Sequence, residues 1–370
     1  MSAVVQTALR AEQQGNFEAA AAAWQKVVKA QPANAQAYAH LGLCEARQQH
    51  YPEAIAAYRR ARQLKPSIPQ LNLNLGLALF KSGAFHDSVA PFEAELKATP
   101  SDQRVTILLG MAHYGAREYA AAVPYLKAAA ERDQKNLSLR LSLAHCYLWT
   151  KQFQKVLDVY KEILEIDSNS AEADMIAGEA LDEKGDNAGA EAQFRAAEKA
   201  NPKEPNVHFG LAYLLWTQKR YEEAIPEFYA ELANDPNNDQ AMLYLGDTYV
   251  RSEQYDKAKQ MLEQALKYQG KEPLIHLDLG IVYQETGNKD DAVRELKKTI
   301  EMEPDFVNAH FRLAKLYQSM GLRDEAKVEF AKASSLNKKA DKALYERISA
   351  GNARPGEAPA PAPVPAQEQH

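Results

Sequence analysis

A single pattern of 34 residues repeats ten times from residue 1 to residue 340, with no insertion or deletion between the copies. Position 8 is always Ala or Gly: Ala8, Gly42, Gly76, Gly110, Ala144, Gly178, Ala212, Gly246, Gly280 and Ala314. Position 24 is always large: Trp24, Tyr58, Phe92, Leu126, Tyr160, Phe194, Phe228, Leu262, Leu296 and Phe330. A fixed period in this range predicts a solenoid, in which one supersecondary unit recurs and each copy packs on its neighbours.

The spacing within each copy predicts two helices. In the second copy, Tyr38, Leu41 and Glu45 are three and four residues apart, so they share one face of a first helix. The small residue at position 8 lets the second helix approach closely, and the large residue at position 24 fills the gap between them. Glycine at position 15 supplies the left-handed backbone of a helix end in five copies, as Gly15, Gly83, Gly185, Gly287 and Gly321.

The pattern resembles the tetratricopeptide repeat, in which a large residue, Leu-Gly, Tyr, Ala, Phe and Pro recur at set spacings. The second copy carries it as Tyr38, Leu41, Gly42, Tyr51, Ala54, Tyr58, Ala61 and Pro66. The resemblance implies an all-α fold, a right-handed α-solenoid superhelix of ten antiparallel helix-turn-helix repeats over residues 1–340. We expect residues 341–350 to form a C-terminal capping helix, and the Pro/Ala-rich residues 351–370 to form a disordered tail.

Two sets of polar residues occupy positions that the pattern reserves for packing. Glu95 and Glu231 stand at position 27, and we expect them to tilt toward solvent or a nearby lysine, because buried carboxylates need partners. His208, His276 and His310 stand at position 4, where the family prefers an aromatic residue. We expect these imidazole rings to stack in the core.

Composition argues against several classes of function and leaves the compartment open. The net charge is −6 and no dense basic run is present, which argues against nucleic-acid binding. No stretch reaches the roughly 18 apolar residues of a membrane span, and no signal peptide is visible. Because the chain opens at position 1 of a repeat, the localisation is unknown: cytoplasmic by default, periplasmic or secreted if an upstream signal peptide has been removed.

The sequence predicts no enzyme, no metal site and no cofactor. His113, His145 and Cys146 lie in adjacent copies and suggest a metal or nucleophile site. A third ligand at metal spacing is missing, however, and neighbouring positions 9 and 10 of a helix point in different directions. Cys44 and Cys146, three copies apart, are interpreted as small, reduced core residues. No glycine-rich phosphate loop is present.

Function is expected on the concave face, which positions 2, 5, 9, 12 and 13 of each first helix line in the family. Positions 4, 7, 8 and 11 are committed to packing, so the residues themselves also leave this face free. Its partner-binding groove is predicted from Leu73, Leu77, Phe80, Met111, Tyr114, Trp149, Phe209, Tyr213, Trp216, Leu243 and Ile281. The sixth copy interrupts this apolar strip with an acidic patch of Glu179, Asp182 and Glu183, which we expect to be solvated or to meet a basic residue of a partner.

The leading hypothesis is a non-enzymatic scaffold for protein–protein interaction. An exposed apolar strip of this length favours a groove that holds a protein or peptide segment by apolar anchors. Position 9 holds no asparagine and position 5 no lysine, so the family's clamp for a peptide carboxylate is not expected. Alternatives are a binder of lipid, glycan or another small amphiphile, a homo-oligomeric assembly module, and tight winding that buries part of the strip. The chain is expected to be a monomer or a weak homodimer.

Overall fold

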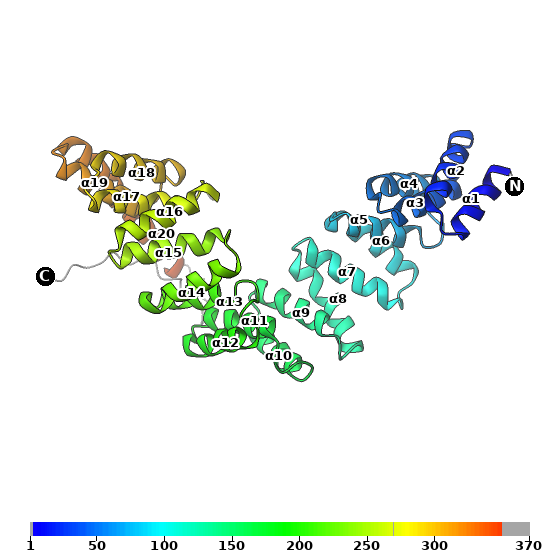
Figure 1. Cartoon of the computed structure of the whole chain (residues 1–370), viewed down its shortest axis with the longest axis horizontal. Helices are drawn as coiled ribbons and strands as arrows, with labels where there is room; N and C mark the ends of the chain where they lie inside the picture. Colours follow the sequence, from blue (N-terminus) through cyan, green and yellow to red (C-terminus); the bar gives the residue numbers. More distant parts are fainter. Residues whose placement is uncertain (1–2, 269, 350–370) are drawn as a thin grey trace. The chain divides into compact units, whose positions relative to one another are not determined.

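The computed structural model describes residues 3–268 and 270–349, and this part of the chain is all-α, with twenty helices and no strand (Figure 1). The first helices of the repeats are α1 (Ala3–Gln13), α3 (Ala35–Arg47), α5 (Leu71–Lys81), α7 (Gln103–Gly115), α9 (Leu137–Trp149), α11 (Ala171–Glu183), α13 (Val207–Thr217), α15 (Asp239–Arg251), α17 (Pro273–Glu285) and α19 (Val307–Ser319). The second helices are α2 (Phe17–Ala30), α4 (Tyr51–Leu64), α6 (Phe85–Ala98), α8 (Tyr119–Arg132), α10 (Phe153–Leu164), α12 (Asn187–Ala200), α14 (Tyr221–Asn234), α16 (Tyr255–Tyr268), α18 (Lys289–Met302) and α20 (Arg323–Ser349). Each repeat is therefore a helix-turn-helix pair.

The chain divides into two compact units, which we call unit 1 (Met1–Gly210) and unit 2 (Leu211–His370). In unit 1 each helix from α1 to α12 packs on the next one in sequence, and in unit 2 the same holds from α14 to α20. First helices of successive repeats also touch, as α3 on α5, α9 on α11 and α15 on α17. This packing confirms the predicted α-solenoid of helix-turn-helix repeats.

The contact between positions 8 and 24 holds each repeat together, as the sequence predicts. A Cβ atom built on Gly76 would lie 2.5 Å from the ring of Phe92, and one on Gly42 would lie 2.7 Å from the ring of Tyr58. Phe92 is fully buried and Tyr58 is almost so. The first and second helices thus approach so closely that a methyl group at Gly42 or Gly76 does not fit beside the ring.

The turn between the two helices has the same backbone in all ten repeats. Position 15 has positive φ in every copy, from five glycines as predicted and from five other residues, Gln49, Arg117, Lys151, Lys219 and Glu253. The amide of position 16 then donates to the carbonyl of position 11, for example Gln152 N–H to Tyr147 O at 2.8 Å. This bond and the left-handed residue before it are the Schellman motif, which satisfies carbonyls that a helix end leaves open.

The start of the first helix is set by position 34 of the preceding copy. In six places the side chain there accepts a hydrogen bond from a backbone amide of the first turn: Asn34, Asp102, Asn136, Ser170, Asn238 and Glu272. The third and seventh copies differ, because α5 and α13 begin at position 3, and the residue just before each of them, Gln70 or Asn206, has a left-handed backbone with φ of +59° or +63°.

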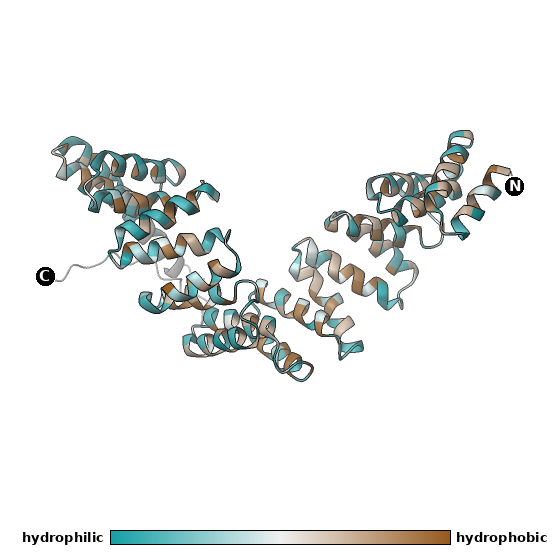
Figure 2. Ribbon diagram, in the orientation of Figure 1, coloured by the Kyte–Doolittle hydropathy of each residue, from teal (hydrophilic) through white to brown (hydrophobic). Residues whose placement is uncertain are grey.

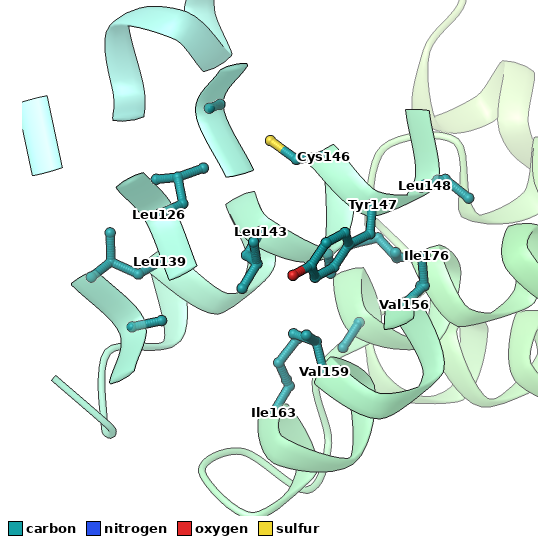
Figure 3. Packing of buried hydrophobic residues seen from close by; sticks show 14 of the residues in the cluster. Leu126, Leu139, Leu143, Cys146, Tyr147, Leu148, Val156, Val159, Ile163 and Ile176 are labelled. Carbon is teal, nitrogen blue, oxygen red and sulfur yellow. The ribbon is translucent and has the colours of Figure 1, made fainter. Parts of the chain in front are cut away.

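The apolar sides of the helices form several buried clusters along unit 1. Hydrophobic and hydrophilic residues interchange along most helices in Figure 2, as expected for helices that bury one side. Figure 3 shows one core region of unit 1, where Leu126 of α8, Leu143 and Cys146 of α9, and Ile163 of α10 are buried together. No described helix is long and apolar enough to cross a membrane.

The expectation that Glu95 and Glu231 tilt toward solvent is wrong. Both side chains are buried, Glu231 to 2% exposure, and neither reaches solvent as predicted. The Asn238 side-chain amide donates to Glu231 Oε1 at 3.1 Å, so a neutral side chain is among the partners of this carboxylate. Buried polar groups are nearly always hydrogen-bonded, and a neutral amide close to a buried carboxylate can provide such a bond.

The histidines at position 4 are buried as expected, and His276 and His310 also hydrogen-bond to carboxylates. Nδ1 of His276 lies 2.7 Å from Glu295 Oε2, and Nδ1 of His310 lies 2.6 Å from Glu329 Oε2. Each carboxylate stands at position 23 of the same repeat, so the pair joins a first helix to its own second helix. Position 4 therefore supplies a polar link here in place of an aromatic contact.

The C-terminal segment continues the last repeat. Residues expected to form a separate capping helix belong to α20, which runs without a break from Arg323 to Ser349. The predicted tail, residues 351–370, lies outside the described residues.

Candidate functional site

The residues of the predicted groove differ widely in exposure. Trp149 is 64% exposed, and among the described residues it is one of the most open large hydrophobic side chains. Most of the others are half-buried: Leu73, Leu77, Phe80, Met111, Tyr114, Phe209, Tyr213 and Trp216. Leu243 is only 2% exposed and Ile281 only 9%. These two belong to the region where the first helices α15 and α17 pack on each other, so they offer little surface to a partner.

Three aromatic residues of unit 1 form one cluster of contacting rings, which we call the aromatic ledge: Tyr114, Tyr119 and Trp149. The rings of Trp149 and Tyr119 are stacked, with centroids 5.7 Å apart and planes 12° from parallel. Tyr114 meets Tyr119 edge to face at 5.9 Å. Trp149 thus lies open to solvent on one side while the ring of Tyr119 supports the other. Tyr119 begins α8 at position 17, a column of the repeat pattern that gives no sign of a place in the groove.

The predicted acidic patch adjoins the aromatic ledge through His145. The rings of Tyr114 and His145 are 6.4 Å apart, and Nε2 of His145 lies 3.2 Å from Oε1 of Glu172. Desolvation by surrounding protein atoms raises the pKa of Glu179, although water reaches its side chain. His145 opposes this rise, whereas the charges of Asp182 and Glu183 add to it. The acidic patch therefore places several carboxyl groups close together beside the aromatic ledge.

In unit 2 the ring of Trp216 is fixed from several sides. Tyr213 stacks on it at 5.6 Å, and Tyr244 meets it edge to face at 5.0 Å. Its Nε1–H donates to Asp247 Oδ2 at 2.5 Å, and Nε of Arg251 donates to the same oxygen at 2.5 Å. The Arg251 guanidinium also lies 5.3 Å from the centroid of the Trp216 ring. Trp216 is therefore a held, half-buried ring, in contrast to the open Trp149.

The sequence prediction missed Asp247 and Arg251, although a signal was present. Their spacing of four residues on α15 is typical of an ion pair on one helix face. Asp247 and Arg251 stand at positions 9 and 13, which are both groove positions. The sequence could therefore have predicted that this ion pair interrupts the apolar strip. The prediction considered only the apolar residues of this repeat.

The residues weighed as a metal or nucleophile site are occupied by structural contacts. Nδ1 of His113 lies 2.6 Å from Glu118 Oε2, and Glu118 Oε1 lies 2.5 Å from Nδ1 of His86. Cys146 is fully buried, and burial raises the pKa of its thiol to about 12. A thiol with so high a pKa remains protonated, so it is a poor nucleophile and a poor metal ligand.

A cavity in unit 1 contains none of the predicted groove residues. It has a volume of about 750 Å³ and lies between α8, α9 and α10. Leu143, Tyr147 and Val159 form an apolar part of its lining, and acidic and basic residues mix around it. Because neither sign of charge dominates, the lining does not favour a particular class of ligand.

Comparison with curated proteins gives no significant match. Among solved structures, MamA is 27% identical over 45% of this chain and 96% of its own, with a TM-score of 0.42. YrrB, described as a TPR protein with an unusual peptide-binding site, is 20% identical over 50% of this chain and 95% of its own, with a TM-score of 0.44. The pilF protein of Pseudomonas aeruginosa is 19% identical over 56% of this chain and 93% of its own, with a TM-score of 0.49.

Sequence models of the tetratricopeptide repeat match almost the whole repeat region. One matches residues 5–69, 48–103 and 177–239, a second matches 113–180, 215–277 and 250–305, and a third matches 307–339. The matched ranges lie within the region of the ten helix pairs, in which positions 8 and 24 pack on each other. The chain therefore belongs to the tetratricopeptide repeat family.

Proposed function

We propose that this protein is a non-enzymatic scaffold that binds a segment of a partner protein on the aromatic ledge of unit 1. The observation that carries the proposal is the exposure of Trp149, at 64%, on a ring stack that already fixes its orientation. Large exposed aromatic side chains are frequent anchors of binding interfaces, and a fixed ring loses little conformational entropy on binding.

The charge beside the aromatic ledge indicates the chemistry of the partner. Glu172, Glu179 and Glu183 belong to the repeat that follows Trp149, and His145 contacts Glu172 and acts on the charge of Glu179. A partner segment with an apolar or aromatic anchor and a nearby Lys or Arg complements both surfaces. Its cation also gains from the exposed face of the Trp149 indole.

The test is a selection of random twelve-residue peptides, displayed on phage, against the full chain. Enriched peptides are then measured by fluorescence polarisation against wild type, Trp149→Ala and the control Val328→Ala. Val328 of α20 is similarly exposed, at 65%, but lies on a second helix outside the aromatic ledge. We expect Trp149→Ala to weaken binding at least tenfold, about 1.4 kcal/mol, and Val328→Ala to leave it unchanged.

Two further measurements separate this proposal from its rivals. Glu179→Gln with Glu183→Gln is expected to weaken binding and to reduce its dependence on salt. Native mass spectrometry of the freshly purified protein is expected to give the bare monomer. A retained small amphiphile, or a dimer that Trp149→Ala dissociates, would assign the aromatic ledge to that role and refute the peptide scaffold. Equal affinity of the selected peptides for Trp149→Ala and wild type would refute it as well.

A further inference from the structure

His145 of α9 lies between the aromatic ledge and the carboxyl groups of α11. Its ring is 6.4 Å from the ring of Tyr114, and its Nε2 lies 3.2 Å from Oε1 of Glu172. The charge of His145 also acts on Glu179. The side chain of His145 is 28% exposed and that of Glu172 is 46% exposed, so water and a partner can reach both groups. A single imidazole ring therefore adjoins both of the surfaces that the proposed function assigns to the partner.

The carboxyl groups of α11 act electrostatically on the aromatic ledge. Burial raises the pKa of Tyr114, and the charge of Glu172 contributes to this rise. A cation bound against the aromatic ledge is then within reach of the same carboxylate. His145 and such a cation therefore occupy neighbouring places around Glu172.

The groups that face His145 come from α11, α7 and α8. Glu172 and Glu179 face it from α11, and Tyr114 faces it from α7, with Tyr119 of α8 behind that ring. The cavity between α8, α9 and α10 is lined by Leu143 and Tyr147, each two residues from His145 and so on the opposite side of α9. Charged side chains of α8 and α10 line that cavity: Lys127, Glu131, Lys155, Asp158 and Glu162.

The charge on His145 determines how strongly the carboxyl groups of α11 attract a second cation. Histidine is the side chain that ordinarily changes charge between about pH 5 and 8. When the imidazole is neutral, the negative charge of Glu172 is available to a Lys or Arg of the partner. When it is protonated, a positive charge stands beside the same carboxyl group and repels the cation of the partner. A proton on His145 and a cation of the partner therefore compete.

The acidic patch changes its charge in the same direction. Desolvation raises the pKa of Glu179 and of Asp182, and neighbouring acidic side chains add to both rises. A carboxyl group with a raised pKa takes up its proton at a higher pH than usual. Acidification therefore removes negative charge from α11 while it adds positive charge at His145, and both changes weaken the attraction for a cation.

We propose that His145 makes partner binding at the aromatic ledge depend on pH, so that a cationic segment is held more tightly above the titration range of histidine than below it. The inference rests on the proposed function and specifies how that site is regulated. Trp149 offers its apolar contact at either pH, whereas the attraction for the cation is strongest while His145 is neutral. Binding of the segment near neutral pH therefore displaces protons from the protein.

The experiment uses a peptide selected against the full chain that depends on Trp149, carries one Lys or Arg and contains no His. Its matched control has norleucine in place of that Lys or Arg, which keeps an apolar stem and removes the charge. Fluorescence polarisation gives both affinities at about pH 6 and about pH 8, at constant ionic strength. We expect the cationic peptide to bind about threefold or more tightly at the higher pH, and the norleucine peptide to bind equally at both.

Isothermal titration calorimetry in two buffers of different ionisation enthalpy counts the protons released. Near neutral pH, wild type is expected to release protons on binding the cationic peptide. His145→Gln is expected to release fewer, because its amide donates to Glu172 without taking up a proton. The exposed variant Glu172→Gln, which removes the carboxylate for which proton and peptide compete, is expected to release fewer as well. Circular dichroism verifies that both variants stay folded.

The matched control variant is His50→Gln, which removes a different His–Glu pair of unit 1. Nδ1 of His50 lies 3.0 Å from Glu45 Oε2, and its side chain is 57% exposed. Because this pair belongs to the second copy, outside the aromatic ledge, His50→Gln is expected to release as many protons as wild type.

Three results would overturn the pH dependence alone: equal affinity of the cationic peptide at both pH values, an equal pH effect on the norleucine peptide, or unchanged proton release in His145→Gln. Selected peptides that need Trp149 but carry no Lys or Arg would also overturn it and leave the aromatic ledge as the binding site. Peptides that bind Trp149→Ala as tightly as wild type would instead refute the proposed function, and its regulation with it.

Discussion

Replacing Gly76 with Ala tests the close contact that holds each repeat together. The added Cβ lies 2.5 Å from Cε1 and 2.6 Å from Cδ1 of the Phe92 ring, whereas carbon atoms normally approach to about 3.5–4.0 Å. Phe92 is fully buried, so its ring has no open space into which to move. Either the ring or one of the helices α5 and α6 has to shift.

Two effects of opposite sign set the change in the free energy of unfolding caused by Gly76→Ala. Alanine favours a helix over glycine by about 1 kcal/mol, whereas overpacking of a core costs about 1–3 kcal/mol. Because the overlap exceeds 1 Å against a confined ring, we expect the upper end of that cost and a net loss of about 1–2 kcal/mol. With Phe92→Ala in the background the overlap disappears, and the same substitution at Gly76 is expected to stabilise by up to about 1 kcal/mol.

The assay is hydrogen exchange of the α5 and α6 amides, read by mass spectrometry, because repeat arrays do not unfold as one unit. A loss of 1–2 kcal/mol speeds local exchange by about 5–30-fold. The control is Gly83→Ala, where no atom lies within 4 Å of the added Cβ but φ is +81°, so backbone strain lowers stability in both backgrounds. An effect of Gly76→Ala with the same sign with and without the Phe92 ring would refute the reasoning.

Three further predictions concern backbone strain, acid and thiol chemistry. Lys151→Gly is expected to stabilise α9 and α10 by about 1 kcal/mol in the same exchange assay, because φ is +57° at this position; faster exchange would contradict the strain argument. Burial opposes ionisation of Glu295, but hydrogen bonds from His276, Lys298 and Arg294 outweigh it and lower its pKa to about 2. Ionised Glu295 therefore contributes about 3 kcal/mol to the free energy of unfolding above its ordinary pKa near 4.5, and this contribution is lost as the pH falls toward 2. Acid titration followed by circular dichroism should show a shallower loss of helical structure in Glu295→Gln than in wild type. Burial raises the pKa of Cys44 and Cys146 to about 12, so N-ethylmaleimide at about pH 8 should leave both unmodified until denaturant is added, as read from the intact mass.

The repeat period determined most of the fold that was predicted. The alternation of small position 8 with large position 24 fixes the distance between two helices, and the structure shows that contact at Gly42 and Gly76. The left-handed turns were predicted only where glycine stands. Gln49 and Lys151 are not residues that favour positive φ, so the sequence at the turn does not predict this backbone; the packing of the two helices imposes it.

The candidate site was harder to predict, because exposure depends on how successive first helices meet. Trp149 and Leu243 both occupy groove positions of their repeats, yet one is open and the other is buried. A 34-residue period encodes the contacts inside a repeat, whereas the tilt between repeats arises from many small differences in side-chain volume.

The left-handed residue of each turn has a consequence for how such a chain tolerates change. Half of the copies bend without glycine, so the direction of the bend is a property of the finished hairpin and not of the amino acid at its apex. A whole repeat of 34 residues can then be exchanged for another copy, or removed, without redesigning the turn between its two helices. Engineers who wish to shorten or recombine this protein should cut at the boundaries between repeats and leave each turn inside its own repeat.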